Sequence, residues 1–309
     1  MERSENRSAR CDRRQILGLA AGAALSSCVG AARGAVDLEA ELARLEGDGR
    51  LGVALLDTRD GRLRGRRLDE RFALCSTFKL VLSAMTLERA ARGGAALATR
   101  LSVTRAELLS HAPVTGAAVE AAVARGLEVA ELSLGELAEA AQTRSDGTAA
   151  NVLLRDFGGP AALTDFCRAQ GDARTRLDRY EPEMNDVRVG DVRDTTTPRA
   201  MAQLVARLLG DALAPAARAQ LRQWMLVTET GLTRVRAGLP ADWTAGDKTG
   251  TGGGDGVTVK CNDVLWIEPP GRAPLVLAVY YDTGVVADWP SAADEAVLAE
   301  VGRLVARAV

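Results

Sequence analysis

Apolar residues recur along both ends of the chain with the periods of helices and strands. Positions 38, 42 and 45 are apolar, which predicts a helix over 37–46. The run 51–57 is apolar almost throughout and predicts a strand that turns at Asp60-Gly61 into a second strand. Toward the other end, the pattern predicts three strands and a closing helix, over 243–251, 263–268, 275–282 and 291–308.

Between these ends, from about 83 to 232, the pattern is mostly helical. Ser133-Leu134-Gly135-Glu136 has the form of a capping box that opens one helix, and Thr197-Pro198 opens another. A sheet built from both chain ends, with a helical lobe inserted, satisfies this order. We therefore predict a two-lobe α/β (α+β) fold. An antiparallel sheet flanked by helices would take up 37–82 and 233–309, and an all-helical lobe 83–232, including the loop 179–194.

The first 32 residues have the pattern of an export signal. Arg13-Arg14 precedes a segment of small apolar residues, 16–32, and this order resembles a twin-arginine signal. Gly30-Ala31-Ala32 fits an ordinary cleavage site, whereas Leu25-Ser26-Ser27-Cys28 resembles a lipobox that would place a lipid on Cys28. Because the apolar segment continues past Cys28, we favour ordinary cleavage and a periplasmic protein.

The overall composition narrows the function further. The chain has 309 residues, is 47% hydrophobic and carries a net charge of −2, so nothing in its composition points to nucleic acid as a partner. A single histidine, His111, argues against a zinc site and permits a Ser-His-Asp triad only through that residue. Beyond the export segment, Cys75, Cys167 and Cys261 allow at most one disulfide and form no C-x-x-C pair. We expect neither a metal nor a cofactor.

Candidate chemistry begins at Cys75-Ser76-Thr77-Phe78-Lys79. Apolar residues at 78, 81, 82 and 85 fit one face of a helix, so we expect Ser76 at or near its N-terminus, on the same face as Lys79. A helix N-terminus directs N–H groups at developing negative charge, and burial favours the neutral form of a lysine, which is a base. Only three of the 39 Lys and Arg residues are lysines, at 79, 248 and 260, and arginine cannot lose its proton. A serine nucleophile with a lysine partner is one interpretation; a capping serine with a solvated lysine is the other.

Two further stretches carry polar side chains, one at a break between two helices and one on a strand that runs into glycines. Ser145-Asp146-Gly147 falls in a break between helices expected over 134–142 and 148–155, where a plain N-cap is the alternative. The stretch 248–252, Lys-Thr-Gly-Thr-Gly, lies on a strand that runs into glycines, where a ligand can come close to the backbone. A simple hairpin is the alternative there.

The loop from Arg179 to Asp194 has neither a helical nor a strand period. A loop of this length is uncommon unless it has a function, and Arg179 could pair with Asp194 to close its base. Glu181 precedes Pro182, which holds it in an extended conformation and so aims its carboxylate. A solvated acidic turn is the alternative.

These four stretches, in this order and at these separations, resemble the class A serine β-lactamases, whose motifs are S-x-x-K, S-D-N and K-T-G. The resemblance covers about 37–309. It implies a monomeric enzyme that hydrolyses the β-lactam amide of penicillin- and cephalosporin-type antibiotics through a serine acyl-enzyme, and so confers antibiotic resistance. The small-molecule β-lactam is the implied partner, and a lipid on Cys28 would be the sole link to a membrane.

The resemblance also implies a role for each matching residue. Ser76 would be the nucleophile, Lys79 and Glu181 would share the base role in acylation, and Ser145 would relay a proton to the leaving nitrogen. Glu181 and Asn185 would hold and activate the water that hydrolyses the ester. The N–H groups of Ser76 and Thr251 would form the oxyanion hole. The residues implied to bind the substrate are Lys248, Thr249, Gly250, Thr251, Arg234, His111 and, at the position of the usual asparagine, Gly147.

The chain departs from the family pattern in several places. Gly147 puts the preference between penicillins and cephalosporins in doubt, and the hairpin over 252–261 is about four residues longer than expected. Arg234 matches an arginine that some members use in place of one absent near Lys260, although a solvated helix end is the alternative. His111 falls where an aromatic gate residue is common, and a surface histidine is equally compatible.

Cys75 precedes the nucleophile, as in carbapenem-hydrolysing members, where it is disulfide-bonded. The usual partner position here is Gly252, and a bridge to Cys261 would require a rearranged hairpin. We therefore expect a buried free thiol.

Three other kinds of protein remain as rivals. A D,D-peptidase would lack the Glu181–Asn185 water site, and a β-lactam receptor domain would need no deacylation base and is usually tethered to a signalling segment. An inactive structural lipoprotein would leave four intact motifs unexplained.

Overall fold

The computed structural model describes residues 37–94 and 96–309. The predicted export signal, 1–32 with Cys28, lies outside the described residues. Among the described helices, none is both long and apolar enough to cross a membrane. The helices are α1 Leu38–Leu45, α2 Phe78–Ala91, α3 Pro113–Val123, α4 Leu134–Thr143, α5 Gly147–Phe157, α6 Pro160–Ala169, α7 Pro198–Arg207, α8 Pro215–Leu226 and α9 Ala292–Ala308. The strands are β1 Arg50–Asp57, β2 Leu63–Arg66, β3 Phe72–Ala73, β4 Arg100–Thr104, β5 Val129–Ser133, β6 Thr195–Thr196, β7 Thr244–Gly254, β8 Val257–Glu268 and β9 Leu275–Val286.

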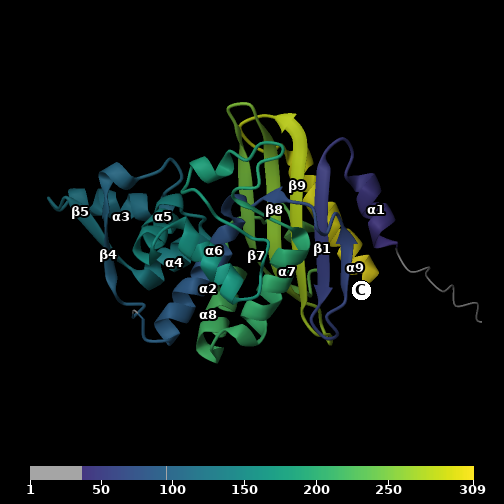
Figure 1. The fold of residues 1–309 in the computed structure, drawn as a ribbon, viewed down its shortest axis with the longest axis horizontal. Coiled ribbons are helices and arrows are strands. Elements are labelled where there is room, and N and C mark those ends of the chain that lie inside the picture. Colours follow the sequence, from purple (N-terminus) through teal and green to yellow (C-terminus); the bar gives the residue numbers. More distant parts are fainter. Residues whose placement is uncertain (1–36, 95) are drawn as a thin grey trace, which may run out of the picture. The chain divides into compact units, whose positions relative to one another are not determined.

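The main sheet combines strands from both ends of the described chain, as predicted (Figure 1). Its order is β2-β1-β9-β8-β7, and every neighbouring pair is antiparallel. Strand β1 pairs with β9 through Val53 and Val279, which are far apart in sequence. This order leaves β7 at an edge of the sheet, where its outer side is free to face a cleft.

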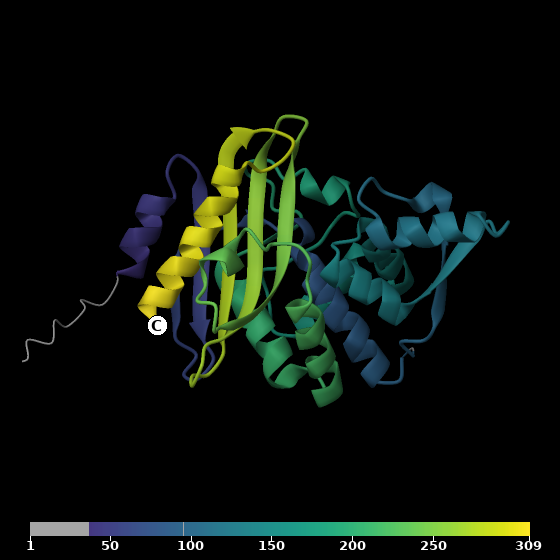
Figure 2. The same ribbon diagram turned by 180° about the vertical axis from the view of Figure 1, so that it is seen from behind.

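The two faces of the sheet contribute to separate hydrophobic cores, because side chains alternate along each strand. Val53 and Leu55 pack with α1 and α9 on one face, and Figure 2 shows α9 lying along that face. Ala54 and Leu56 belong to the larger core on the other face, where α7 and α8 contact the sheet. Helix α2, which carries Lys79, packs in this second core.

Helix α2 is the central element of the helical part. Residues Phe78–Leu87 are all buried, so the helix is enclosed on every side by α4, α5, α6 and α8. A helix held on all sides also fixes the turn Cys75–Thr77 that runs directly into it, and that turn carries the candidate nucleophile.

The prediction that the inserted lobe is all-helical is wrong. Strands β4 and β5 form a two-stranded sheet within it, and β6 pairs with β3. The period-two pattern is weak there because Val103 is the one buried residue of β4, so most of the strand carries no apolar signal. The division into lobes 37–82 with 233–309 and 83–232 stays a prediction.

Most predicted helices and strands are confirmed, with shifted ends at β7 and β8. The strand predicted over 263–268 begins at Val257, and the strand predicted to end at 251 continues to Gly254. These extensions pair with each other, Gly254 opposite Val257. The glycines of the β7 extension carry no apolar pattern, which is why periodicity did not predict that extension.

Candidate active site

Ser76 lies where the turn Cys75–Thr77 runs directly into α2, so it is at the helix N-terminus as predicted. The Thr77 hydroxyl donates to the carbonyl of Leu74 at 2.7 Å and closes the turn. Cys75 has a φ of +42°, a left-handed conformation that costs a non-glycine residue free energy and is typical of functional turns. The serine is therefore presented by a tightly held turn, not by a free loop.

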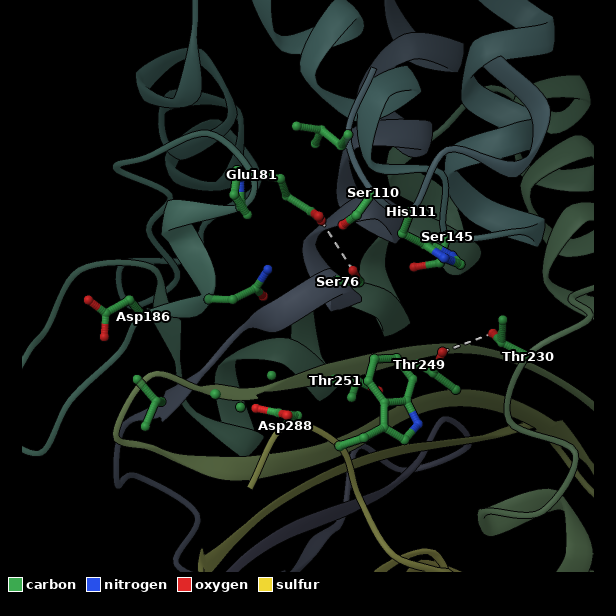
Figure 3. Close-up of a pocket in the computed structure, with 18 of the residues that line it drawn as sticks. Ser76, Ser110, His111, Ser145, Glu181, Asp186, Thr230, Thr249, Thr251 and Asp288 are labelled. Atoms are coloured by element: carbon green, nitrogen blue, oxygen red, sulfur yellow. Dashed lines mark hydrogen bonds between the residues drawn. The ribbon is translucent and has the colours of Figure 1, made fainter. Parts of the chain in front are cut away.

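Lys79 and Glu181 both contact the serine hydroxyl. The Lys79 ammonium donates to Ser76 Oγ at 2.9 Å, and Ser76 Oγ donates to Glu181 Oε1 at 3.2 Å. Lys79 Nζ also lies 2.7 Å from Glu181 Oε1, which makes a nearly dry ion pair because the lysine is 1% exposed. Figure 3 shows Glu181 directed at Ser76 from the opposite wall. The serine proton thus points at the Glu181 carboxylate, and Lys79 becomes a second base when its ammonium passes a proton to Glu181.

Ser145 joins the two lysines of the site. Lys248 Nζ donates to Ser145 Oγ at 3.0 Å, and Lys79 Nζ donates to the Ser145 carbonyl at 2.7 Å. The N-cap of α5 is Asp146, whose carboxylate accepts from the Ala149 N–H at 2.8 Å. The capping interpretation is therefore correct for Asp146, and it leaves the Ser145 hydroxyl free to face the cleft.

Lys248 is completely buried, and its surroundings disfavour its charge. Burial, together with the positive charge of Lys79, lowers the pKa of Lys248 to about 7. Its ammonium is held by Ser145 Oγ and by the Thr249 carbonyl at 2.9 Å. A lysine in this state can bind an anion or exchange a proton near neutral pH.

The loop 179–194 is closed at its base as predicted. Arg179 Nε lies 2.6 Å from the carboxylate of Asp194, which is fully buried and also accepts the N–H groups of Asp178 and Arg179. Asn151 fixes the backbone of Glu181 from both sides: its side-chain amide donates to the Glu181 carbonyl at 2.8 Å and accepts the Glu181 N–H at 3.0 Å. The carboxylate of Glu181 is therefore aimed by its backbone.

Asn185 lies on the same loop and lines the same cleft. Its side-chain oxygen is buried and has no hydrogen-bond partner among the described residues. A buried acceptor without a partner is costly, so this position is suited to a water or ligand that donates a hydrogen bond.

Strand β7 lies close against the serine turn. A Cβ at Gly250 would lie 3.0 Å from the carbonyl oxygen of Leu74, so a side chain there would push the strand away. Thr249 and Thr251 line the cleft, and Arg234, 4% exposed, donates to Thr251 Oγ1 at 2.8 Å. Arg234 also donates to the carbonyls of Gly250 and Asn262, so it is a buried member of the site and not a solvated helix end.

All of the candidate residues are brought into one region. Ser76, Lys79, Ser145, Glu181, Asn185, Arg234, Thr249, Thr251 and His111 line a cleft of about 640 Å³. Lys248, Gly250 and Gly147 stand directly behind this lining, where Gly147 N–H donates to the His111 carbonyl at 2.9 Å. A Cβ at Gly147 would lie 3.0 Å from Glu181 Oε2, so the glycine allows that carboxylate to approach the backbone closely.

The three described cysteines are free and buried, which confirms the expectation for Cys75. A bridge between Cys75 and Cys261 is ruled out by their positions, because Cys261 packs in the core that α1 and α9 cover while Cys75 packs with Ala73 and Val187. Burial raises the pKa of the Cys75 thiol to about 12, which keeps it unreactive. Within 37–94 and 96–309, no group of three or more His, Cys, Asp or Glu side chains could hold a metal ion.

Sequence reasoning missed several residues of the site. Asn151 lies one helical turn after Gly147, and that spacing could have placed it on the same face. Thr230, whose hydroxyl lies 2.8 Å from that of Thr249, and Asp288 and Trp289 also line the cleft. No local pattern distinguishes these three, since they reach the cleft through tertiary folding.

Comparison with known proteins gives consistent matches. A sequence model described as the Beta-lactamase enzyme family matches residues 37–309. A β-lactamase of Streptomyces fradiae is 45% identical over 97% of this chain and 98% of its own length, and β-lactamase L2 of Stenotrophomonas maltophilia is 46% identical over 84% and 82%. A solved structure of an ancestral class A β-lactamase is similar with a TM-score of 0.80 and 50% identity, covering 87% of this chain and 98% of that chain. The family match includes every residue that lines the cleft.

Proposed function

This chain belongs to the class A serine β-lactamases, which hydrolyse the β-lactam amide through a serine acyl-enzyme, and we propose that Ser76 is its nucleophile. One observation carries this assignment: Ser76 Oγ contacts both Lys79 Nζ and Glu181 Oε1 inside the cleft. A serine hydroxyl is weakly nucleophilic until an adjacent base takes its proton. The reaction inactivates the antibiotic and so confers resistance.

In the acylation step, Ser76 Oγ attacks the β-lactam carbonyl carbon while its proton passes to Glu181 directly, or to Lys79 after the Lys79 ammonium has given a proton to Glu181. Ser145 then donates its proton to the β-lactam nitrogen as the C–N bond breaks. The proton taken from Ser76 returns to Ser145 through Lys79, whose Nζ lies 2.9 Å from Ser76 Oγ and 3.4 Å from Ser145 Oγ, so Glu181 is a carboxylate again before deacylation. The N–H groups of Ser76 and Thr251 stabilise the negative charge on the carbonyl oxygen. Strand β7 comes close to the serine turn at Gly250, which supports an oxyanion hole made of one N–H from the turn and one from the strand.

In the deacylation step, Glu181 removes a proton from a water that attacks the ester carbonyl, and Ser76 Oγ leaves with a proton. Asn185 supports this role, because its buried side-chain oxygen has no partner among the described residues and can accept from that water. General-base catalysis of this kind contributes about 10²- to 10⁴-fold in rate.

The substrate carboxylate is held at the β7 end of the site. Lys248 and Arg234 supply positive charge there, and the hydroxyls of Thr249 and Thr251 supply hydrogen bonds. Arg234 is oriented by Glu295, at 3.2 Å from its Nε, and by the hydroxyl of Thr251. His111 stands at the cleft wall, with Nε2 3.1 Å from the Arg144 carbonyl, and would contact the substrate face.

Hydrolysis of a penicillin by matched variants tests the nucleophile. Ser76→Ala should lose at least 10³-fold in kcat, because no other hydroxyl takes the same place. Ser83→Ala is the control, since Ser83 lies on α2 but is buried against the Ala138 carbonyl, outside the cleft. Residual hydrolysis near the wild-type rate in Ser76→Ala would overturn the assignment.

We also propose that the chain is exported to the periplasm as a monomer through its Arg13-Arg14 segment. Replacing both with lysine keeps the charge and should trap the protein in the cytoplasm, as fractionation would reveal. The intact mass of the exported form separates cleavage after Ala32 from a lipid on Cys28.

A further inference from the structure

Two segments close one end of the cleft, and none of the roles above uses them. They are the tip of the β7–β8 hairpin, 252–257, and the segment 285–289 that ends β9 and follows it. Residues of both line the cleft. Because they bound the space that a substrate substituent would enter, they are placed to influence which β-lactams bind.

The two segments are packed against each other and against the 179–194 loop. The Gly254 N–H donates to the Ala287 carbonyl at 2.8 Å, and a Cβ at Gly253 would lie 2.4 Å from that same oxygen. Arg188 donates to the Asp255 carbonyl at 3.2 Å from the loop side. These backbone contacts hold the segment that carries Trp289 in place.

Trp289 is the large aromatic side chain of this wall. It lines the cleft and is 66% exposed, although an indole is among the most costly side chains to leave in water. Among the described residues that line the cleft, no other has an indole, phenol or phenyl ring. An exposed indole facing a substrate cleft offers a flat surface for a planar ring.

The charges along the cleft are segregated. Lys79 and Arg234 lie at the reacting end and are paired with carboxylates. Three further carboxylates line the cleft without an ion pair or side-chain hydrogen bond to any described residue: Glu183, Asp255 and Asp288. Asp288 directly precedes Trp289 in the sequence, and Asp255 lies at the tip of the β7–β8 hairpin. A carboxylate beside an aromatic face favours a cationic group.

We propose that Trp289 and Asp288 form a subsite for a planar, positively charged substituent of the β-lactam. The substituent ring stacks on the indole and its charge lies near the Asp288 carboxylate, while an anionic substituent is repelled. This proposal rests on the function proposed above, because it concerns a second part of the same substrate. It makes this end of the cleft a determinant of specificity and leaves the chemical step unchanged.

Two cephalosporins with the same acylamino side chain provide the test, one carrying a pyridinium substituent at the end of the molecule and one a neutral acetoxymethyl group. The wild type should favour the cationic substrate in kcat/KM, mainly through KM. Trp289→Ala should lower kcat/KM for the cationic substrate roughly five- to tenfold more than for the neutral one. Trp289→Phe should keep most of the preference for the cationic substrate, because a phenyl ring can also stack. Asp288→Asn should remove only the electrostatic part of that preference, which high salt also removes.

Val285→Ala is the matched control, because Val285 is exposed on the same segment and does not line the cleft. It should leave the ratio of the two substrates unchanged. An equal effect of Trp289→Ala on both substrates, or no effect on either, overturns the subsite while leaving the β-lactamase function intact. Failure of the wild type to hydrolyse either substrate would contradict the proposed function instead.

Discussion

At the scale of single residues, the site is organised by two buried lysines that share Ser145. Lys79 contacts Ser76 and Glu181, whereas Lys248 contacts the Ser145 hydroxyl from β7. The sequence predicted both lysines through their rarity and their motifs. It could not predict which atoms each would contact, because those distances depend on how the loop 179–194 and β7 fold against α2.

The pH dependence of substrate capture tests Lys248. Since burial and the charge of Lys79 lower its pKa to about 7, the ammonium is present below that pH and is lost as the pH rises through it. We expect kcat/KM to fall above about pH 7, up to tenfold per pH unit. The fall in kcat should be smaller, because a bound substrate carboxylate favours the protonated lysine.

Lys248→Arg provides the comparison, because a guanidinium keeps its charge throughout this range. Its pH profile should stay flat where that of the wild type falls. Lys260→Arg, at a buried lysine paired with Asp282 outside the cleft, should follow the wild type. A Lys248→Arg profile as steep as the wild-type profile would show that another group controls the fall.

Gly147 is expected to set the balance between β-lactam classes. An asparagine there would bring an amide into the cleft, and its Cβ would lie 3.0 Å from Glu181 Oε2 and 3.1 Å from Leu109 Cδ1, so both neighbours must shift. Gly147→Asn should change the ratio of penicillin to cephalosporin kcat/KM by about tenfold. Gly135→Asn, at a first-turn helical glycine with room for a Cβ, should not. Unchanged ratios for Gly147→Asn would remove this residue from the account of specificity.

At the scale of elements, periodicity predicted the helices and the main strands because each buries one face or both. It failed at β4, where burial is slight, and at the tip of β7, where glycines replace side chains. Periodicity could not show the close contact between β7 and the serine turn, because it joins Cys75 and Gly252 across the fold. The family resemblance alone implied it.

A disulfide engineered across this contact tests the register of β7 against the serine turn. A Cβ at Gly252 would lie 3.0 Å from Cys75 Sγ, about the separation that a disulfide imposes between a Cβ and the partner sulfur. Gly252→Cys should therefore oxidise to a bridge with Cys75 and raise the free energy of unfolding by about 2–4 kcal/mol. Thermal unfolding with and without reductant measures the gain.

Gly252→Ser is the control for that experiment, because it adds a side chain of similar size that cannot bridge. Its melting temperature should not respond to reductant. If oxidised Gly252→Cys still shows the thiol count of its reduced form on labelling, β7 does not lie against the turn as described.

At the scale of the whole described chain, one sheet draws strands from both ends and leaves β7 at its edge beside α2. The order of the predicted strands and helices predicted this sheet, and the resemblance of the motifs to one family implied that they share one site. Asn151 and Trp289 escaped prediction for opposite reasons. Asn151 lies four residues after Gly147 on α5, and this helical spacing was sufficient to predict it. Trp289 follows β9 in a segment without a repeating pattern, so nothing local could predict it.

The central claim is that Ser76 is acylated and that Glu181 is needed to release the product. Intact-mass measurement after mixing with a penicillin tests it most directly, using the wild type, Glu181→Ala and Ser76→Ala. We expect turnover without a lasting adduct in the wild type, a stable adduct on Ser76 in Glu181→Ala, and no adduct in Ser76→Ala. A wild type that stays acylated, or a Glu181→Ala variant that turns over at the wild-type rate, would contradict the account.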